Sequence, residues 1–401
     1  MSSNWETLPL GEIAKLEIET IAVEPGSKFD YAGVYNEGRG VFNRGVLKDT
    51  ETSYPKLHVL RPNRIVMRKL TAWEGPIAVV PEEFDGFVVS PEFPTFLLDS
   101  TRITPEFASL ICQRSSFWGK MAERATGSVQ RRKRVSPSQL LAIEVSIPSI
   151  AEQWRIVDLI SSADSMVSAC ERALRAAVVT SGRVRENEIS SLPKTPLRSL
   201  IERIEAGKSF QAERRPPSAD ERGVLKVSAI QQAGFVAEES KAVTSGIFLD
   251  PRWEVQEGDV LMTRANSPER VGMVCRVHKV RPGLFLCDKT LRLVSDPEVV
   301  DPDFLAYAMQ TDEVRSRLTA AATGTSASMV NVSQQKIMSL EVAFPELPQQ
   351  QRIADLLRAQ GETVSALERK LGSAKDLRNA LLEDLLSGRH LIPDSYDHLL
   401  N

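Results

Sequence analysis

The chain has 401 residues, which allows two to four domains at roughly 100 to 200 residues each. Hydrophobic residues make up 42% of it and charged residues 26%, close to the globular average, so neither general disorder nor a membrane protein fits. No run of about 18 apolar residues occurs, and no basic start precedes an apolar stretch, so we expect a cytoplasmic protein.

The cysteine content and the charge distribution further limit the classes of protein to which the chain can belong. Four cysteines are too few for a disulfide framework, and free thiols suit a reducing compartment. The net charge of −3 hides an even balance, because residues 1–148 carry 18 basic and 18 acidic side chains and residues 193–345 carry 20 of each. Binding of nucleic acid would therefore require positive charge gathered on one face, or a partner that supplies much of the attraction for phosphates.

The sequence repeats itself at an offset of 197 residues. Residues 135–159 fall on residues 332–356 with ten identities, and the same offset brings Gly75 onto Gly272. A repeat of this length indicates two similar domains rather than a solenoid, whose units span roughly 20 to 50 residues.

We predict a first domain over residues 1–148. Short β-type runs at residues 63–67 and 86–89 lie between clusters of Gly, Pro, Asn and Asp, which is typical of strands joined by turns. A helix follows, because Thr104 and Pro105 form an N-cap and first-turn proline signal. The first domain is therefore expected to be α+β.

Contact with DNA requires side chains that read base edges, together with cations that neutralise phosphates. The first domain offers such side chains near its predicted strand and in a basic run: Arg64, Arg68, Lys69, Trp73, Arg124, Gln130, Arg131, Arg132, Lys133 and Arg134. A solvated surface loop is the alternative interpretation of the run at residues 130–134.

Residues 149–192 are predicted to form a long central helix. Positions spaced alternately by four and three residues, from Ile156 to Glu188, form a seam in which eight of ten residues are apolar. A 3.5-residue period sustained over about four heptads favours coiled-coil pairing.

We predict a second α+β domain over residues 193–345, with strands at 258–262 and 283–286 and a helix beginning at Asp301-Pro302. Its candidate DNA contacts are Lys208, Arg214, Arg215, Gln231, Gln232, Arg264, Asn266, Lys289 and Asn331. The alternative for Arg214 and Arg215 is a loop whose charges keep it soluble. Residues 324–331, which match the basic run of the first domain, are uncharged. Two domains that read different sequences would show this difference, and random drift explains it equally well.

A distal helix is predicted over residues 346–391, followed by a tail at 392–401, and its seam from Ile353 to Leu385 has the same period and length as the central one. We expect the two helices to pair with each other as an antiparallel coiled coil, which would give a pseudo-two-fold molecule with a domain at each end of a rigid spacer. Two separate amphipathic helices lying on their own domains are the alternative.

Tests for enzyme motifs argue against catalysis on this chain. Residues 206–209 end like a phosphate-binding loop, but Glu202 stands where that loop needs its first glycine. Glu239 and Lys241, with Asp220 upstream, resemble part of a metal-dependent nuclease site, yet two-metal chemistry needs more converging carboxylates. We expect no catalytic residue.

The spacing of cysteine and histidine also argues against a zinc site. Cys275, His278 and Cys287 lack the fourth ligand that a tetrahedral structural site requires, and both cysteines lie in apolar runs where buried free thiols are ordinary. We therefore expect no metal and no cofactor.

The layout as a whole resembles the specificity (S) subunit of type I restriction-modification systems. The resemblance rests on the Pro-x-x-x-x-Gln-x-Arg-Ile segments at Pro148–Ile156 and Pro345–Ile353, and on the stretch Glu257–Met262 followed by Val271-Gly272. It covers residues 8–392. The first segment departs from the second at residues 149–151 and 154, so the second copy is the better match.

The resemblance implies a non-catalytic subunit with two target-recognition domains, each reading half of a split site in double-stranded DNA. It also implies a coiled coil on which adenine methyltransferase subunits, two of them by our expectation, assemble with restriction and motor subunits. Two other hypotheses stay open from the sequence: a single-chain or detached part of a restriction enzyme with cryptic metal-dependent nuclease activity, and a coiled-coil scaffold without DNA specificity.

Overall fold

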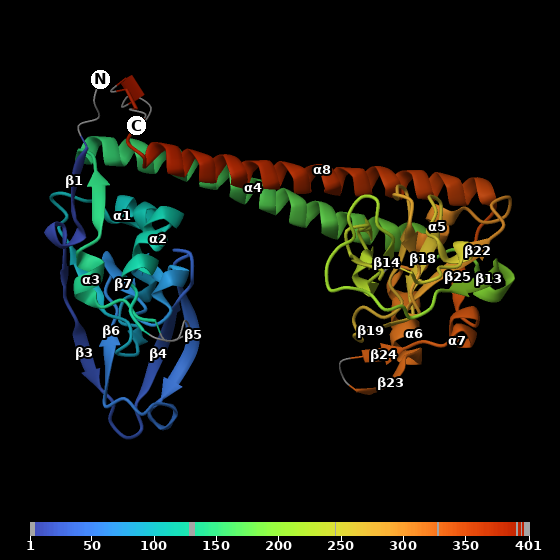
Figure 1. Ribbon diagram of the computed structural model, residues 1–401, viewed down its shortest axis with the longest axis horizontal. Coiled ribbons are helices and arrows are strands. Elements are labelled where there is room, and N and C mark those ends of the chain that lie inside the picture. The colour runs from blue at the N-terminus through green and yellow to red at the C-terminus, as the bar shows by residue number, and fades with distance from the viewer. Residues whose placement is uncertain are drawn as a thin grey trace. The chain divides into compact units, whose positions relative to one another are not determined.

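The computed structural model describes residues 5–127, 133–244, 246–326, 329–389, 392–393 and 395–396. The chain forms two compact units, unit 1 (Met1–Cys170 with Lys370–Asn401) and unit 2 (Glu171–Arg369) (Figure 1). Unit 1 is therefore built from two separate stretches of the sequence, and unit 2 from one continuous stretch.

Unit 1 contains a small two-stranded pair and two larger sheets. Strands β1 (Glu6–Pro9) and β11 (Glu144–Ile147) form the pair. One sheet has the order β2 (Ala14–Leu16), β10 (Thr95–Leu98), β7 (Arg64–Met67) and β8 (Ile77–Val79). The other has the order β3 (Glu19–Ala22), β6 (Lys56–Val59), β9 (Val88–Val89), β4 (Lys28–Val34) and β5 (Val41–Lys48).

Three short helices complete unit 1: α1 (Pro105–Cys112), α2 (Ser115–Arg124) and α3 (Pro137–Leu141). The predicted start of α1 is confirmed, because the Thr104 hydroxyl accepts a hydrogen bond from the Phe107 N–H at 3.2 Å. Phe107 is fully buried in one core with Phe96 of β10 and Met67 of β7. The four-stranded sheet and the helices thus share the main core of the unit.

Unit 2 repeats this frame. Its strand pair is β12 (Lys194–Pro196) with β25 (Glu341–Ala343), and its four-stranded sheet has the order β13 (Ile201–Ala206), β22 (Thr290–Ser295), β18 (Val260–Thr263) and β20 (Val274–Arg276). Its short helices are α5 (Pro302–Ala308), α6 (Asp312–Ala321) and α7 (Gln334–Met338). Helices α6 and α7 begin and end 197 residues after α2 and α3, so the internal repeat of the sequence is a repeat of structure.

The two units differ outside the shared frame. Unit 1 has its five-stranded sheet, whereas unit 2 has two small sheets of short strands and a third small sheet at the place where unit 1 has the isolated bridges of Arg134 with Leu70 and Thr126. The three small sheets are β17 (Ser240–Ala242), β14 (Gly223–Leu225) and β21 (Leu284–Phe285); β15 (Ile230–Gln231) and β16 (Gly234–Phe235); and β19 (Ala265–Asn266), β24 (Met329–Asn331) and β23 (Thr323–Ser326).

Two long helices, α4 (Ile150–Ile189) and α8 (Leu347–Leu385), belong in part to each unit. In unit 1 the start of α4 packs on the end of α8, because Ile156 shares a core with Leu385. In unit 2 the end of α4 packs on the start of α8, because Ile189 shares a core with Ile353. The helices are therefore antiparallel. Every position of the two predicted seams is buried or half-buried, except Glu188, which is exposed.

Candidate nucleic-acid interface

The glutamine of the repeated Pro-x-x-x-x-Gln-x-Arg-Ile segment is a buried structural residue. In unit 1 the Gln153 side chain accepts a hydrogen bond from the Thr104 N–H (2.8 Å) and donates to the carbonyls of Arg102 (2.8 Å) and Pro148 (3.0 Å). The side chain therefore ties the first turn of α4 to the start of α1.

Unit 2 contains the same three hydrogen bonds. The Gln350 side chain accepts from the Asp301 N–H (2.9 Å) and donates to the carbonyls of Val299 (3.2 Å) and Pro345 (2.8 Å). All three partners lie 197 residues after their counterparts in unit 1. The segment that carries the family resemblance thus fixes each long helix to the globular part that it follows.

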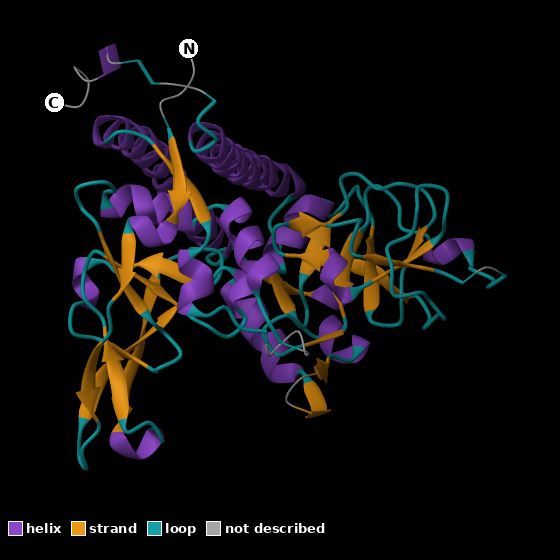
Figure 2. Cartoon of the chain, turned by 60° about the vertical axis from the view of Figure 1, so that its left-hand side comes forward, coloured by secondary structure: helices purple, strands orange, loops and turns teal. Residues whose placement is uncertain are grey.

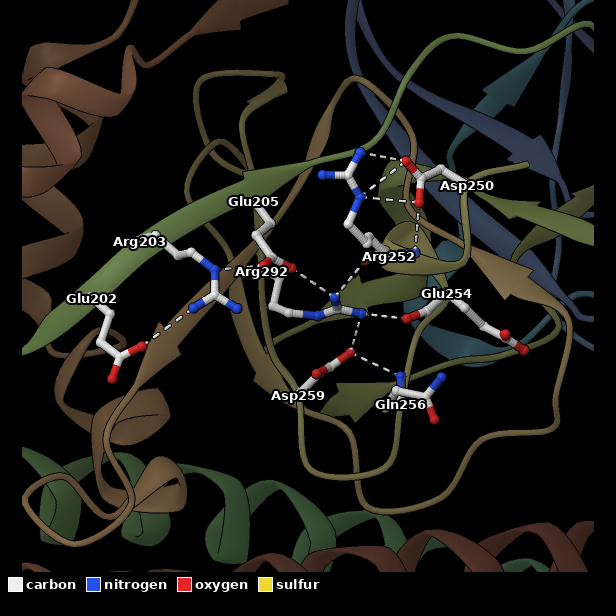
Figure 3. Close-up of polar contacts among 9 residues, drawn as sticks. All are labelled: Glu202, Arg203, Glu205, Asp250, Arg252, Glu254, Gln256, Asp259 and Arg292. Atoms are coloured by element: carbon white, nitrogen blue, oxygen red, sulfur yellow. Dashed lines mark hydrogen bonds and ion pairs between the residues drawn. The ribbon is translucent and has the colours of Figure 1, made fainter. Parts of the chain in front are cut away.

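A second part of the resemblance, the stretch Glu257–Met262, also has a structural role. The Asp259 carboxylate accepts hydrogen bonds from the Gln256 N–H at 2.8 Å and forms an ion pair at 2.7 Å with the Arg292 guanidinium. Arg292 further pairs with Glu205 at 2.8 Å and donates to the carbonyls of Arg252 and Glu254. Figure 3 shows the Arg292 side chain enclosed by these partners, which join β13, β22 and the start of β18.

Several predicted DNA contacts of unit 1 have carboxylate partners in this structure. Arg64 on β7 pairs with Glu17 at 3.1 Å, and Arg68 pairs with Glu74 at 3.2 Å while also donating to Asn36. These arginines therefore stabilise the frame, and their contact with DNA stays a prediction.

The end of the basic run is fixed against the turn that follows β7. Arg134 exchanges backbone hydrogen bonds with Thr126, and its guanidinium lies 3.5 Å from Glu92, which is 4.0 Å from Lys69. The Lys133 carbonyl accepts from the N–H of Thr71 at 3.0 Å. Three predicted contacts of the run, Gln130, Arg131 and Arg132, lie outside the described residues.

The two remaining predicted contacts of unit 1 are Trp73, within this turn, and Arg124 of α2. Trp73 is half-buried, and its indole N–H meets no acceptor within the described part of the chain. Arg124 ends α2 and donates to the Lys120 carbonyl at 3.2 Å.

In unit 2 the structure brings four predicted residues together. Arg264 donates its N–H to the Lys289 carbonyl at 2.8 Å, and Ala265 beside it pairs with Asn331 across β19 and β24. Asn266 follows on β19, and Lys289 also contacts Met329 of β24. A hollow of about 560 Å³ next to this cluster is lined in part by three lysines, Lys226, Lys241 and Lys289.

The other predicted residues of unit 2 are dispersed over its surface. Lys208 lies 5.3 Å from the centre of the Trp253 ring, and Arg214 is exposed. Arg215 forms ion pairs with Glu213 and Glu221. The hydrogen bond from Arg215 holds the pKa of the Glu221 carboxyl well below its ordinary range. Gln231 and Gln232 are exposed at the turn between β15 and β16.

The residues that resemble parts of a nuclease site and a zinc site have structural contacts in the folded chain. The Glu239 carboxylate is held by Lys226 and Ser228, and burial raises the pKa of the Cys275 thiol to about 12. His278 lies 3.6 Å from Asp303. Among the described residues, no three His, Cys, Asp or Glu side chains lie close enough together to hold a metal ion. No helix in that part of the chain has the length and apolarity needed to cross a membrane.

Sequence reasoning missed a group of arginines and aromatic residues on β4, on β5 and in the turn that joins them. Arg44 lies over the ring of Tyr31, and Arg39 lies over the ring of Tyr35. The alternation of polar and aromatic residues over 28–31 is the signal that could have found this strand.

Comparison with known proteins gives one match in sequence. No protein-family model matches the chain. The type I restriction enzyme EcoEI specificity subunit of Escherichia coli is 29% identical over 189 residues, which cover 46% of this chain and 32% of that relative. The match thus spans about a third of the length of the curated relative.

Solved structures share the fold. A chain from a structure on complex assembly and conformational transition of the type I R-M system has a TM-score of 0.60 and 16% identity, with 95% of this chain and 97% of that chain covered. The type I restriction-modification S subunit from M. genitalium has a TM-score of 0.53 and 14% identity, with 95% and 96% covered. The resemblance is confirmed: the chain is similar to type I specificity subunits in sequence over nearly half its length and in fold over almost all of it.

Proposed function

We propose that this chain is the DNA-specificity subunit of a type I restriction-modification complex. Its two α+β parts each bind one half of a bipartite site in double-stranded DNA. The two long helices carry adenine methyltransferase subunits, two of them, and the restriction and motor subunits join this assembly. The chain itself supplies specificity and has no catalytic role.

The observation that carries the proposal is a repeated frame with two different peripheries. The glutamine hydrogen bonds, the strand pair, the four-stranded sheet and the short helices occur in both units, while the remaining sheets differ. A protein that reads two unrelated half-sites needs one way to hold its reading surfaces and two different surfaces.

We assign the DNA-reading domains to residues 1–148 and 193–345, the central helix to 149–192 and the distal helix to 346–391, with a tail at 392–401. The complex works in the cytoplasm, which agrees with four buried free cysteines in the described chain.

Methylation mapping of the source genome with and without this gene tests the proposal. We expect one bipartite adenine-methylated sequence to disappear when the gene is deleted and to return when it is restored. An unchanged methylation pattern would favour a scaffold without specificity. Mg²⁺-dependent cleavage of DNA by the isolated chain would favour the nuclease hypothesis.

A further inference from the structure

Strands β4 and β5 of unit 1 form a two-stranded ribbon at the edge of the five-stranded sheet. β5 pairs with β4 and lies at the end of the sheet order. In Figure 1 the ends of β4 and β5 away from their connecting turn reach, with β3 and β6, toward the end of unit 1 that is remote from α1 and α2, and Figure 2 shows loops and a short helical turn there. The outer side of β5 is exposed from Asn43 to Val46.

A bulge in this ribbon sets the direction of Arg44. The pairing passes from Asp30↔Val46 to Ala32↔Asn43, so Arg44 and Gly45 together stand opposite a single residue, Tyr31. Gly45 has a φ of 93°, and its N–H donates to the Asn43 side chain at 2.6 Å. Such bulges re-aim a side chain relative to the regular pleat.

The bulge places the Arg44 guanidinium over the Tyr31 ring. The guanidinium carbon is 4.8 Å from the ring centre, and a guanidinium N–H donates to the Tyr31 hydroxyl at 3.4 Å. Contact of this kind holds the flat guanidinium group in one plane.

The aromatic surface continues along the same ribbon. The rings of Tyr35 and Phe42 stack at 4.3 Å, and Arg39 lies 5.5 Å from the centre of the Tyr35 ring. A Cβ added to Gly33 would come within 2.6 Å of the Phe42 ring, so this ring is seated directly on the strand. The aromatic side chains of this surface therefore contact one another and the strand beneath them.

Arg44 differs from the predicted arginines of unit 1 in its charge environment. Arg64, Arg68 and Arg134 each lie within 4 Å of a carboxylate, whereas Arg44 forms no ion pair with any residue in the described ranges. Arg39 is weaker in this respect, because Glu37 lies 3.9 Å from it. The Arg44 side chain is thus an exposed, oriented cation with N–H groups free to donate.

We infer that the β4–β5 ribbon is a DNA-reading element of unit 1 and that Arg44 determines the identity of one base pair. The inference rests on the proposed function. The major groove of duplex DNA admits a two-stranded β-ribbon, and arginine recognises guanine there through two parallel hydrogen bonds to O6 and N7. The aromatic residues position Arg44, and the neighbouring Arg39 adds positive charge near the phosphates.

The test uses the full chain in complex with its methyltransferase partner. The probes are duplexes that carry the bipartite sequence found by methylation mapping and single base-pair substitutions across both half-sites. Equilibrium dissociation constants are measured for the unaltered chain, Arg44→Ala, Arg44→Lys and the control Lys15→Ala at several salt concentrations. Lys15 is an exposed cation on β2, in the other sheet of unit 1.

We expect the unaltered complex to discriminate by about 5-fold to 150-fold at one G·C pair of the half-site read by unit 1. Arg44→Ala should bring that ratio close to one and leave the other half-site unchanged. Arg44→Lys should also lose most of the discrimination, because an ammonium group cannot form the paired hydrogen bonds. Lys15→Ala should keep the whole specificity profile.

Tyr31→Leu tests the positioning role of the ring. It keeps a large apolar side chain but removes the flat surface under Arg44, so discrimination at the same base pair should fall while discrimination elsewhere persists. Tyr31→Phe, which keeps the ring, should retain it.

Two results would overturn the inference while leaving the proposed function intact. The first is an unaltered specificity profile in Arg44→Ala. The second is a uniform loss of affinity for every duplex, with a salt slope reduced by about 0.9, which would identify Arg44 as a phosphate contact. If the unaltered complex recognises no bipartite sequence at all, the proposed function fails and the inference fails with it.

Discussion

Gln153 and Gln350 show how one side chain joins a helix to the domain before it. Each makes three hydrogen bonds with backbone groups, two of which lie 49 and 51 residues away in the sequence, and each is fully buried. Buried backbone groups that lose their partners are costly, because water cannot replace the lost hydrogen bonds.

We predict that Gln350→Ala lowers the free energy of unfolding of the chain by roughly 1–3 kcal/mol, since it leaves the Asp301 N–H and the Pro345 carbonyl without their partner. Urea unfolding measures the change. The control is Gln351→Ala, an exposed neighbour on the same helix, which should change stability by less than about 0.5 kcal/mol. Equal effects of the two substitutions would show that the hydrogen bonds of Gln350 are not stabilising.

Arg292 makes the stability of unit 2 depend on pH. Burial alone would raise the pKa of the Glu205 carboxyl, but hydrogen bonds from Arg203 and Arg292 outweigh it and hold that pKa below its ordinary value. A carboxyl whose pKa is lower in the folded than in the unfolded chain stabilises the fold above its unfolded pKa. That stabilisation is lost as the pH falls through the folded value.

We therefore expect wild-type stability to fall from pH 6 to pH 3 by more than that of Glu205→Gln, which has no carboxyl to protonate at this site. Urea midpoints over this range measure the difference. Glu346→Gln, a change at an exposed carboxylate of the same unit, serves as the control and should follow the wild type. Parallel curves for wild type and Glu205→Gln would contradict the role of this carboxyl.

At the residue scale the sequence indicated which side chains are important. It was less informative about the role of each of them. Gln153 and Gln350 were found as parts of a repeated segment, but their partners become visible only when the chain is folded. The sequence predicts Arg64, Arg68 and Arg134 as DNA contacts, and in the structure Glu17, Glu74 and Glu92 pair with them. Two of these three acids lie far from their arginines in the chain, so composition and spacing could not reveal the pairs.

At the scale of elements, the turn before β8 shows why the repeat places glycine at two positions. Gly75 and Gly272 both have positive φ values, 67° and 70°. A Cβ at Gly75 would lie 2.6 Å from the Trp118 indole of α2, and one at Gly272 would lie 2.9 Å from Leu318 of α6. The second short helix of each unit thus packs directly on this turn.

We predict that Gly75→Ala destabilises the chain by at least about 1–2 kcal/mol, because it combines an unfavourable φ with a steric clash. Gly119→Ala is the matched control. Gly119 follows Trp118 on α2 and has open space around its Cβ position, so alanine should stabilise by about 0.5–1 kcal/mol through helix propensity. Thermal unfolding of both variants gives the signs, and a neutral Gly75→Ala would mean that α2 can move away from the turn.

The predicted elements that rest on local signals are present, and the missed ones depend on tertiary context. The proline-led helices begin where Thr104 and Asp301 cap them. The β-type run at 63–67 contains β7, and the run at 258–262 overlaps β18. The ribbon of β4 and β5 was not predicted, because the comparison of the two halves favours features that both share. Its bulge also interrupts the alternation on which strand prediction relies.

At the scale of the whole molecule, the repeat separates the frame that both units share from the sheets that differ between them. The frame is specified twice by the same kinds of residue, and the sheets beyond it are free to differ. The sequence could predict the frame because a duplication of 197 residues supplies its own internal comparison. It could not predict the bases recognised, since these depend on side-chain positions at the periphery.

Helices α4 and α8 pack on each other at both of their ends, once within each unit. We predict that the middle of the two helices can be shortened without loss of this packing. Removal of residues 167–173 from α4 and 364–370 from α8 takes one heptad from each, so both seams stay in phase. The deletion keeps Ile156 and Leu385 in unit 1 and Ile189 and Ile353 in unit 2, so the packing that fixes each helix to its unit is retained.

If the paired helices set the distance between two DNA-reading domains, this deletion shortens it by about 10 Å at 1.5 Å per residue. With a rise of about 3.4 Å per base pair, the gap of the recognised site should contract by up to about three base pairs while both half-site sequences persist. The duplex must absorb a changed twist of roughly 100°, so some loss of affinity is expected. Methylated-site sequencing with the shortened complex measures the gap. Retained activity at the original gap would show that the helices do not set the spacing, and a heptad removed from α4 alone, which breaks the pairing register, should abolish methylation.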